Sequence, residues 1–542
     1  MKKLMIIAVA TLLSSVANAQ TIYDAAKFTG KDLNGTARFV GMGGAMGALG
    51  GDISTIGTNP AGIGIYRSND IMTSFSFSAY GMESSYIGHE KRMFNSNLNN
   101  THWSYDNIGF VLSTKIGNYT PVRFVNFGFN YHKSKSFYKN MGMDALLNVG
   151  PKNEIVSQTW QMAQQANGIR NSEFMEGREA FRDNEIGWLS ILGWQGNLIA
   201  ETGDKDSDGG NIYKSIINEI PYATFYSEER GGIDQYDFNV ALNINDRAYL
   251  GFTIGAYDVD YSKYSRYDED YENGKGAGYF LQSWNRISGS GFDFKIGAIL
   301  RPFESSPFRI GMAVHTPTFY KLTLTTSAFL GSDLYYDGAE VTKPVDIDTQ
   351  QAVGDMDRSY RLRTPWTYNL SLGYTVGSSL AVGAEYEYED YSTMKFKYSS
   401  NDGGGDMEFE NAEVKNCLKG EHTFRIGAEY KVIPEFAFRL GYNYSSAVFR
   451  DEAVKYIPSN SLITDTDFSN KRSQSNYTLG IGYRGKMFYA DLAYQLSTYK
   501  ENFYPFYNEF ELTQGEWTMV TPPATKVTNT RSQVLLTVGM RF

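Results

Sequence analysis

The sequence predicts an all-β protein, a transmembrane antiparallel β-barrel of about fourteen strands with long outer loops and an amino-terminal plug that packs against its wall. The final segment alternates with a period of two, which a strand needs when one face meets lipid and the other meets the lumen. The apolar face carries Val534, Leu536, Val538, Met540 and Phe542, and the other face carries Gln533, Thr537, Gly539 and Arg541. Only Leu535 breaks the alternation. With 54 Gly, 40 Tyr and 34 Phe against 14 Pro, the composition suits many short strands with aromatic girdles.

The amino terminus has the three zones of a secretory signal peptide. Lys2 and Lys3 precede an apolar run over 4–13, and Ala17-Asn18-Ala19 gives a small-residue cleavage site. The run is too short for a spanning helix, which needs about 20 residues. We therefore expect residues 1–19 to be removed, and no later segment indicates a membrane helix.

Strands are predicted in pairs that share short turns. Six pairs, a first strand near 71–82 and a last near 530–542 give about fourteen. An even number returns the carboxyl terminus to the side of the amino terminus. The expected long outer connections are 83–103, 136–233, 264–285, 323–364, 392–420, 445–473 and 500–529. Short periplasmic turns and long outer loops are typical of bacterial outer-membrane barrels.

Charged residues alternate with apolar ones on several of these strands. They are Lys295, Arg309, Glu385, Glu387, Arg425, Glu429, Arg439 and Asp491. A basic side chain at the bilayer midplane would cost about 2 to 4 kcal/mol, so the sequence predicts that they point into the lumen. There they would form a bracing ion network, or some of them would line a conduit or meet a ligand head group.

Residues 20–69 differ from the predicted barrel of residues 70–542. A glycine-rich stretch over 41–51 is followed by Asn59-Pro60-Ala61. The dinucleotide-binding pattern fails because Met46 stands where its third glycine would be and no strand precedes it. The Ala, Met and Leu content predicts instead a compact plug against the barrel wall, with Pro60 turning the chain.

This order of segments resembles the FadL/TodX family of outer-membrane transporters of fatty acids and other hydrophobic compounds. The resemblance rests on the signal peptide, the stretch containing Arg38 and Asp52, the Asn59-Pro60-Ala61 motif and the strand units after 364. It implies a monomer in a Gram-negative outer membrane, with residues 20–69 as a lumenal hatch gated at Asn59, Pro60 and Ala61. It also implies capture of a hydrophobic ligand at the outer loops, hatch rearrangement and lateral release into membrane lipid. The barrel-assembly machinery would recognise the last strand of this chain, which ends in Phe542.

Three other functions compete with transport of long-chain fatty acids. A nonspecific porin would need an open lumen, which the plug opposes. A surface receptor or adhesin would use the long loops. A barrel enzyme would use rim groups such as His102 or His422, but no spacing singles out a catalytic set. We therefore predict no enzyme activity, while ligand identity and pocket residues stay open.

Cofactor and metal signals are weak. Cys417 is the only cysteine, and the five histidines show no ligand spacing. The acidic run from Asp204 to Asp208 opens like a calcium loop, but Ser215 stands where the bidentate acid belongs. A solvated turn is favoured there, and we expect no cofactor. A net charge of -10 argues against nucleic acid.

The insertion at 136–233 has two further features. Residues 154–169 are predicted to be helical, with Ile155, Thr159, Met162 and Ala166 at helical spacing. An apolar cluster over 186–194 would either form the core of a cap over the outer mouth of the barrel or bind a hydrophobic ligand. In the early strands, Gly109, Gly117 and Gly128 could host a wall opening or serve packing alone.

Overall fold

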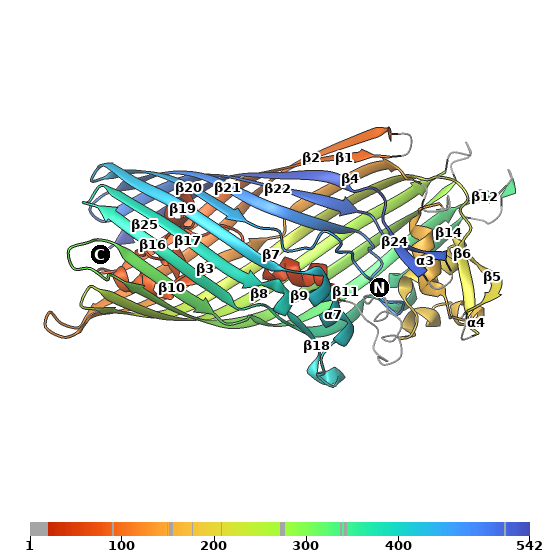
Figure 1. Cartoon of the computed structure of the whole chain (residues 1–542), viewed down its shortest axis with the longest axis horizontal. Helices are drawn as coiled ribbons and strands as arrows, with labels where there is room; N and C mark the ends of the chain where they lie inside the picture. The colour runs from red at the N-terminus through yellow and green to blue at the C-terminus, as the bar shows by residue number, and fades with distance from the viewer. Residues whose placement is uncertain are drawn as a thin grey trace.

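The computed structural model describes residues 20–88, 91–148, 150, 155–175, 177–206, 209–271, 277–336, 339–340, 344–513 and 516–542. The predicted signal peptide lies outside these residues. The chain forms one long barrel of tilted strands with helices inside it and a helical cap at one end (Figure 1). Within the described part, no helix has the length and apolar character that crossing a membrane requires.

Fourteen antiparallel strands close the barrel, which confirms the predicted fold class and strand number. In wall order they are β1 (Asp70–Ile87), β2 (Met93–Lys115), β3 (Val122–Ser136), β7 (Tyr222–Ile244), β8 (Ala248–Asp270), β9 (Gly278–Leu300), β10 (Arg309–His315), β16 (Thr367–Val376), β17 (Leu380–Asp390), β19 (Gly420–Ile433), β20 (Phe436–Ser445), β21 (Phe468–Arg484), β22 (Phe488–Tyr504) and β25 (Thr525–Arg541). The ring closes where β1 pairs with β25, from Asp70↔Arg541 to Ser85↔Lys526.

Several wall strands are interrupted and then resume. β3 resumes as β4 (Lys139–Leu146), β10 as β11 (Phe319–Asp333), and β16 is preceded by β15 (Met356–Arg363). Pro317 and Pro365 stand in two of these breaks, where proline cannot donate a ladder hydrogen bond. Beyond them β11 pairs with β9 and β15, so the wall continues toward the long-loop end.

The predicted outer connections are too long, because the strands continue past the apolar belt. Residues 83–87 and 93–103 belong to the paired strands β1 and β2, and residues 264–270 and 278–285 belong to β8 and β9. Alternation persists there with buried aromatic residues such as Tyr267 and Tyr279. Strand pairing therefore extends wherever an inner layer of side chains is available to cover one face.

The outward face of the barrel carries an apolar belt near the short-turn end. Phe238, Phe252, Leu370, Phe438, Leu479 and Val534 are among its exposed members. On the last strand Gln533 and Thr537 are buried and face inward, as predicted. Leu535 also faces inward, where it packs with Ala37 and Val40 of the plug, and this contact explains the break in its alternation.

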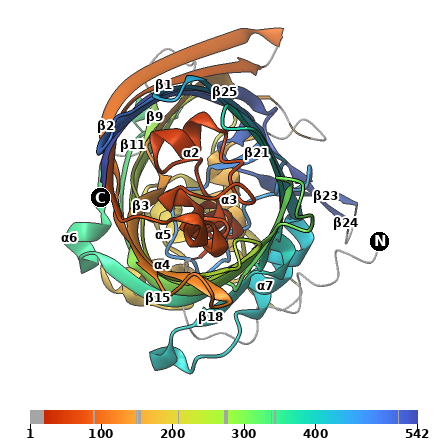
Figure 2. The ribbon, with the colours of Figure 1, turned by 90° about the vertical axis from the view of Figure 1, so that its left-hand side faces the viewer.

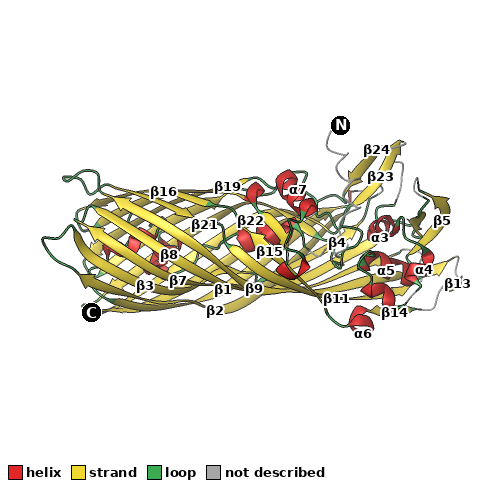
Figure 3. Ribbon diagram, turned by 90° about the horizontal axis from the view of Figure 1, so that it is seen from below, coloured by secondary structure: helices red, strands yellow, loops and turns green. Residues whose placement is uncertain are grey.

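A cap made mainly from the insertion covers the long-loop end (Figures 1 and 3). Its parts are α3 (Gln158–Ala166), α4 (Asn171–Phe174), η6 (Glu179–Arg182), α5 (Trp188–Gln195), β5 (Ile199–Lys205) and β6 (Asn211–Ser215). The predicted helix is confirmed as α3. Trp188, Leu189, Ile191 and Leu192 are fully buried, so the apolar cluster forms the core of the cap. Part of the Asp204 to Asp208 run, residues 207–208, lies outside the described residues.

Smaller elements decorate the same end. They are β12 (Tyr335–Tyr336), β13 (Ala339–Glu340), β14 (Val345–Asp348), α6 (Thr349–Val353), η7 (Tyr391–Thr393), β18 (Lys395–Tyr398), η8 (Ser400–Asp402), α7 (Glu408–Cys417), β23 (Asn508–Thr513) and β24 (Glu516–Val520). Among these, β18 pairs with β15. Helix α7 contacts η7, β18 and the first helix of the plug.

Candidate functional site: a lumenal cavity between hatch, wall and roof

Residues 20–69 fold inside the barrel as four short helices, and we call this segment the hatch. They are α1 (Ile22–Thr29), α2 (Ala37–Gly41), η2 (Ile53–Gly57) and η3 (Pro60–Ile65), and the view along the barrel shows them within the ring of strands (Figure 2). Each begins at a polar cap residue: Thr21, Thr36, Asp52 and Asn59 each accept a backbone hydrogen bond from the first turn. These caps satisfy the free amide groups of helices too short to be stable alone.

The lower hatch, residues 37–66, lies directly on glycines of the barrel wall. An added Cβ at Gly383 would overlap Ala45 O, and one at Gly427 would overlap Met42 O. Gly251, Gly297 and Gly441 meet Pro60, Asn59 and Gly43 in the same way. Wall glycines therefore let two backbones approach where any side chain would hold them apart.

Ion pairs fix the lower hatch to the wall as well. Arg38 makes a bidentate contact with Glu429, through Nε to Oε2 at 2.8 Å and Nη2 to Oε1 at 3.0 Å. Arg439 shares Glu429 and also pairs with Asp491. Together with the Arg425–Glu385, Arg425–Glu387 and Lys295–Asp237 pairs, these contacts confirm that the alternating charges face the lumen.

Asn59 is fully buried and joins three parts of the molecule. Its Nδ2 donates to Gly47 O at 2.8 Å and to Ala298 O of β9 at 3.2 Å. Its Oδ1 accepts from the backbone N–H of Ala61 at 3.1 Å, which caps η3 with Pro60 at the first helical position. The predicted motif therefore binds one hatch loop to another and to the wall.

A cavity of about 370 Å³ lies above the lower hatch. Its floor is made by the upper hatch, residues 20–36, and its sides by β1, β2, β3, β4, β19, β21, β22 and β25. Its roof is the loop 446–467, which connects β20 and β21 and contributes Val448, Phe449, Lys455, Ile463 and Asp465 to the lining. The cap lies over this loop, where Trp188 N donates to Ser461 O at 3.0 Å.

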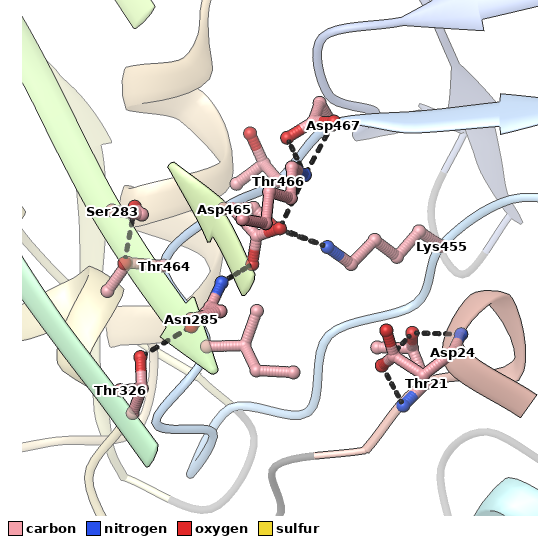
Figure 4. Close-up of polar contacts among 12 residues, drawn as sticks. Thr21, Asp24, Ser283, Asn285, Thr326, Lys455, Thr464, Asp465, Thr466 and Asp467 are labelled. Atoms are coloured by element: carbon pink, nitrogen blue, oxygen red, sulfur yellow. Dashed lines mark hydrogen bonds and ion pairs between the residues drawn. The ribbon is translucent and has the colours of Figure 1, made fainter. Parts of the chain in front are cut away.

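The roof loop is anchored by buried charge (Figure 4). Lys263 Nζ lies 2.7 Å from Asp465 Oδ2 and 2.7 Å from Asp467 Oδ1, and Lys455 Nζ lies 3.2 Å from Asp465 Oδ2. Asp465 also accepts from Asn285 Nδ2 at 2.9 Å, and Thr464 bonds Ser283 at 2.7 Å. Burial alone would raise the pKa of Asp465, but the two lysines outweigh it and hold that pKa below its usual range.

The barrel wall separates on one side of the cavity. β2 and β3 pair from Lys115↔Phe124 up to Asn107↔His132. Beyond that point the described pairings join β2 only to β1, and join β3 and β4 only to β7. We call the stretch between residues 93–106 and residues 133–146 the unpaired seam. Figure 2 shows the β1–β2 hairpin leaving the ring there.

A hatch residue sits at the fork where the seam begins. β2 has a bulge at Asp106, so that Asp106 and Asn107 both face inward. Asn34 Nδ2 donates to Asp106 Oδ1 at 3.0 Å and to Lys133 O at 3.0 Å. One amide of the upper hatch therefore contacts both strands at the point of their separation.

Aromatic side chains line the seam above this fork. Tyr138, between β3 and β4, stacks on His102 of β2 with ring centroids 4.5 Å apart and lies 5.3 Å from Tyr80 of β1. The guanidinium of Arg230 covers the Tyr138 ring at 4.2 Å. Tyr80, Asn99, Asn100, Tyr138 and Asn140 also line the cavity, which therefore extends to the seam.

The sequence pointed to the neighbourhood of the seam but not to its residues. Gly109 and Gly128 lie in the paired part of β2 and β3, where they face Ile53 and Ile56 of the hatch, and Gly117 lies in the turn. Gly109 and Gly128 therefore serve packing, the second of the two roles considered. The sequence signal that could have located the seam is the row of lysines Lys133, Lys135 and Lys139, which lie at odd-numbered positions where β3 ends and β4 begins.

The scan against family models found no match, and the search of curated proteins found none. Three solved structures match nearly the whole chain. A Pseudomonas aeruginosa FadL homologue has 13% sequence identity over 94% of this chain and 99% of its own, with a TM-score of 0.49. The Pseudomonas putida toluene transporter TodX has 10% identity over 95% of this chain and 100% of its own, with a TM-score of 0.44. The Ralstonia pickettii toluene transporter TbuX has 12% identity over 94% of this chain and 99% of its own, with a TM-score of 0.40. These include the family that the sequence resembles. At such identities and TM-scores the likeness assigns neither cargo nor mechanism.

Proposed function

We propose that this protein carries hydrophobic small molecules, long-chain fatty acids in particular, across the outer membrane of a Gram-negative bacterium. The observation that carries the proposal is a lumenal cavity closed below by a tightly packed hatch and extending sideways to an unpaired seam in the wall. An apolar solute gains little from crossing a wet lumen and much from entering hydrocarbon. A side exit into the membrane therefore suits such a cargo better than an axial pore.

The proposed path has three stages. The ligand is captured among the outer loops and enters the cavity beneath the roof loop. The upper hatch then rearranges, because its Asn34 contacts both strands at the fork of the seam. Release follows between β2 and β4, past Tyr80, His102 and Tyr138. Asn59, Pro60 and Ala61 act in this scheme by holding the lower hatch, against which the upper hatch moves.

Uptake of a labelled long-chain fatty acid by cells and by liposomes tests the function. We expect the native protein to bind and transport the acid. An Asn59→Ala, Pro60→Ala variant that still folds as a heat-modifiable barrel should bind it without transport. Steady ion conductance in planar bilayers without fatty-acid binding would instead support the porin alternative.

The lateral route can be tested separately in a Cys417→Ser background. Asn100→Cys places a thiol on the cavity lining at the seam, whereas Asn97→Cys places one at an exposed residue of the same strand that does not line the cavity. Labelling with a bulky maleimide should stop transport in the first variant and spare it in the second. Equal transport by both labelled proteins would exclude release through the seam.

A further inference from the structure

Five basic side chains gather on the outer surface of the wall, in two neighbouring rows across three adjacent strands. In one row, Lys321 of β11 is the direct partner of Arg361 of β15, and Arg361 is the direct partner of Lys397 of β18. In the next row, Arg363 of β15 is the partner of Lys395 of β18. We call these five residues the basic patch.

The alternation of burial shows that the basic patch faces away from the lumen. Leu322 of β11, Leu362 of β15 and Phe396 of β18 are fully buried, so the residues on either side of each point outward. Phe319 and Trp366, which are 41% and 46% exposed, border the patch toward the apolar belt. Exposed aromatic residues at such an edge mark the boundary between membrane and water. The patch therefore lies at the head-group level of the leaflet on the long-loop side, which is the outer leaflet.

Positive charge in the basic patch exceeds the negative charge beside it. Lys395 and Lys397 share one carboxylate, with Nζ at 3.5 Å from Asp406 Oδ2 and at 3.0 Å from Asp406 Oδ1. Within the described part of the chain, no carboxylate oxygen lies within 4.0 Å of a side-chain nitrogen of the other three members. Like charges directly opposite each other on neighbouring strands destabilise a sheet. The patch therefore carries a repulsion that a bound anion would relieve.

The two arginines of the patch are held in place with hydrogen-bond donors to spare. Arg361 donates from Nε to Tyr398 O at 3.1 Å and from Nη2 to Gly404 O at 2.9 Å. These carbonyl groups fix the guanidinium without neutralising it, and three of its five donors remain for another acceptor. The Nε of Arg363 is buried and has no hydrogen-bond partner among the described residues. Buried donors are nearly always satisfied, so this one indicates a ligand or water beside the patch.

The basic patch is remote from the proposed transport path. It lies on β11 and β15, the continuations of β10 and β16, which are the seventh and eighth of the fourteen wall strands. The seam begins at the second, about half-way round the ring. Figure 2 shows β15 and β18 on the opposite side of the barrel from the β1–β2 hairpin. A ligand of the patch would therefore leave both the cavity and the seam free.

We propose that the basic patch binds the phosphate groups of a phosphorylated lipid of the outer leaflet, with the acyl chains of that lipid lying on the apolar belt below. A guanidinium matches the oxygens of a phosphate in a bidentate contact, and lysine adds charge without fixed geometry. Neighbouring strands are about 4.8 Å apart, and residues two apart on one strand are about 7 Å apart. The five cations therefore cover an area that accommodates two phosphate groups, which favours a bisphosphorylated lipid.

The test uses the purified full-length protein in nonionic detergent, with native mass spectrometry counting the bound lipid. The probes are lipid A with two phosphates, with one phosphate and with none. We expect the native protein to bind the bisphosphorylated form at least about tenfold more tightly than the form without phosphate. Raising the ionic strength from about 0.1 M to about 1 M should weaken that binding, because exposed charges are screened. These two measurements need no variant.

A double variant then locates the site. Arg361→Gln with Arg363→Gln should weaken binding of the bisphosphorylated lipid about tenfold, and lysine at both positions should retain part of the affinity. The matched control is Arg266→Gln with Arg286→Gln. It removes the same charge from outward arginines that already pair with Asp268 and Asp260. The control should stay within about twofold of the native protein, and both double variants should remain heat-modifiable barrels.

Three outcomes would overturn the proposal. Equal affinity of the native protein for lipid A with and without phosphate would refute a phosphate site. Equal loss of binding in the two double variants would show a general attraction to charge rather than a site at the basic patch. Displacement of the lipid by inorganic pyrophosphate at an equal concentration would show that the patch holds an adventitious ion only, without a contribution from the acyl chains.

Discussion

The hatch consists of two regions whose contacts with the barrel wall differ in kind. The lower hatch, residues 37–66, touches the wall through backbone against glycine and through shared ion pairs such as Arg38–Glu429. The upper hatch, residues 20–36, borders the cavity and is held through side chains: Asp32 pairs with Lys135 and Arg531, Asn34 bonds both strands at the fork, and the apolar side chains of α1 are buried. Close-packed backbone contacts leave little room for movement, whereas polar side-chain contacts at the edge of a cavity can exchange with a ligand. We infer from this difference that the lower hatch is the fixed part and the upper hatch is the part that rearranges.

The largest expected effect is the loss of the Arg38 anchor. Arg38→Met leaves the buried pair of Glu429 and Arg439 without its third member, and removal of one partner of a buried ion pair costs about 3 to 5 kcal/mol. We expect a lower hatch that unfolds at lower urea concentration than the barrel, measured by proteolysis of residues 37–66.

Arg67→Met is the matched control for this change. Arg67 pairs with Asp246 at the exposed surface, where an ion pair contributes at most about 1 kcal/mol. Equal sensitivity of the two variants would remove the proposed distinction between a fixed and a movable region.

A second effect concerns pH and the support of the upper hatch. Helix α7 packs against α1 and buries Glu410, and this burial raises the pKa of Glu410 to about 7. Because the folded pKa lies above the unfolded value of about 4.3, the stability linked to this group is complete below pH 4. It is lost as pH rises through 7, by about 4 kcal/mol at most.

Hydrogen exchange of residues 408–417 and 22–29 should therefore be slower at pH 5 than at pH 8. Glu410→Gln should abolish that difference, since an amide does not titrate. Hydrogen exchange of the lower hatch should not change with pH in this way. A parallel pH response over residues 37–66 would contradict the distinction between the two regions.

A third effect is steric. Gly383→Val would place side-chain atoms where Ala45 O lies, and such overpacking costs about 1 to 3 kcal/mol. We expect the displaced lower hatch to admit ions, measured as conductance in planar bilayers. Gly405→Val changes a loop glycine that has no atom within 4 Å of an added Cβ, and its conductance should stay at the native level.

The smallest effect is expected at the fork. Asn34→Ala removes two hydrogen bonds between the upper hatch and the seam, at about 1 kcal/mol. Faster hydrogen exchange at residues 104–108 and 132–136, with unchanged exchange in residues 37–66, would locate the mobility in the upper hatch alone. Unchanged exchange at the fork would falsify the role of Asn34 as a contact between the two strands.

Much of the barrel could be predicted because alternation is a local property. The last strand, the inward charges, the number of strands and helix α3 each follow from side-chain spacing within a few residues. The outer connections were overestimated because the pattern of their strands changes beyond the apolar belt, where tyrosine and small polar residues replace aliphatic ones. Asn59-Pro60-Ala61 was recognisable as a motif, and its contacts with Gly47 O and Ala298 O were not.

The sequence by itself determined that the wall is an antiparallel β-barrel, the inward or outward direction of most strand residues and the presence of a separate glycine-rich segment. The tertiary structure alone decided where the wall comes apart and which hatch residue lies at that fork. The physical reason is the distance along the chain over which the deciding contacts act. Strand direction depends on neighbours two residues apart, whereas Asn34, Asp106 and Lys133 meet only because the hatch is folded inside a closed barrel.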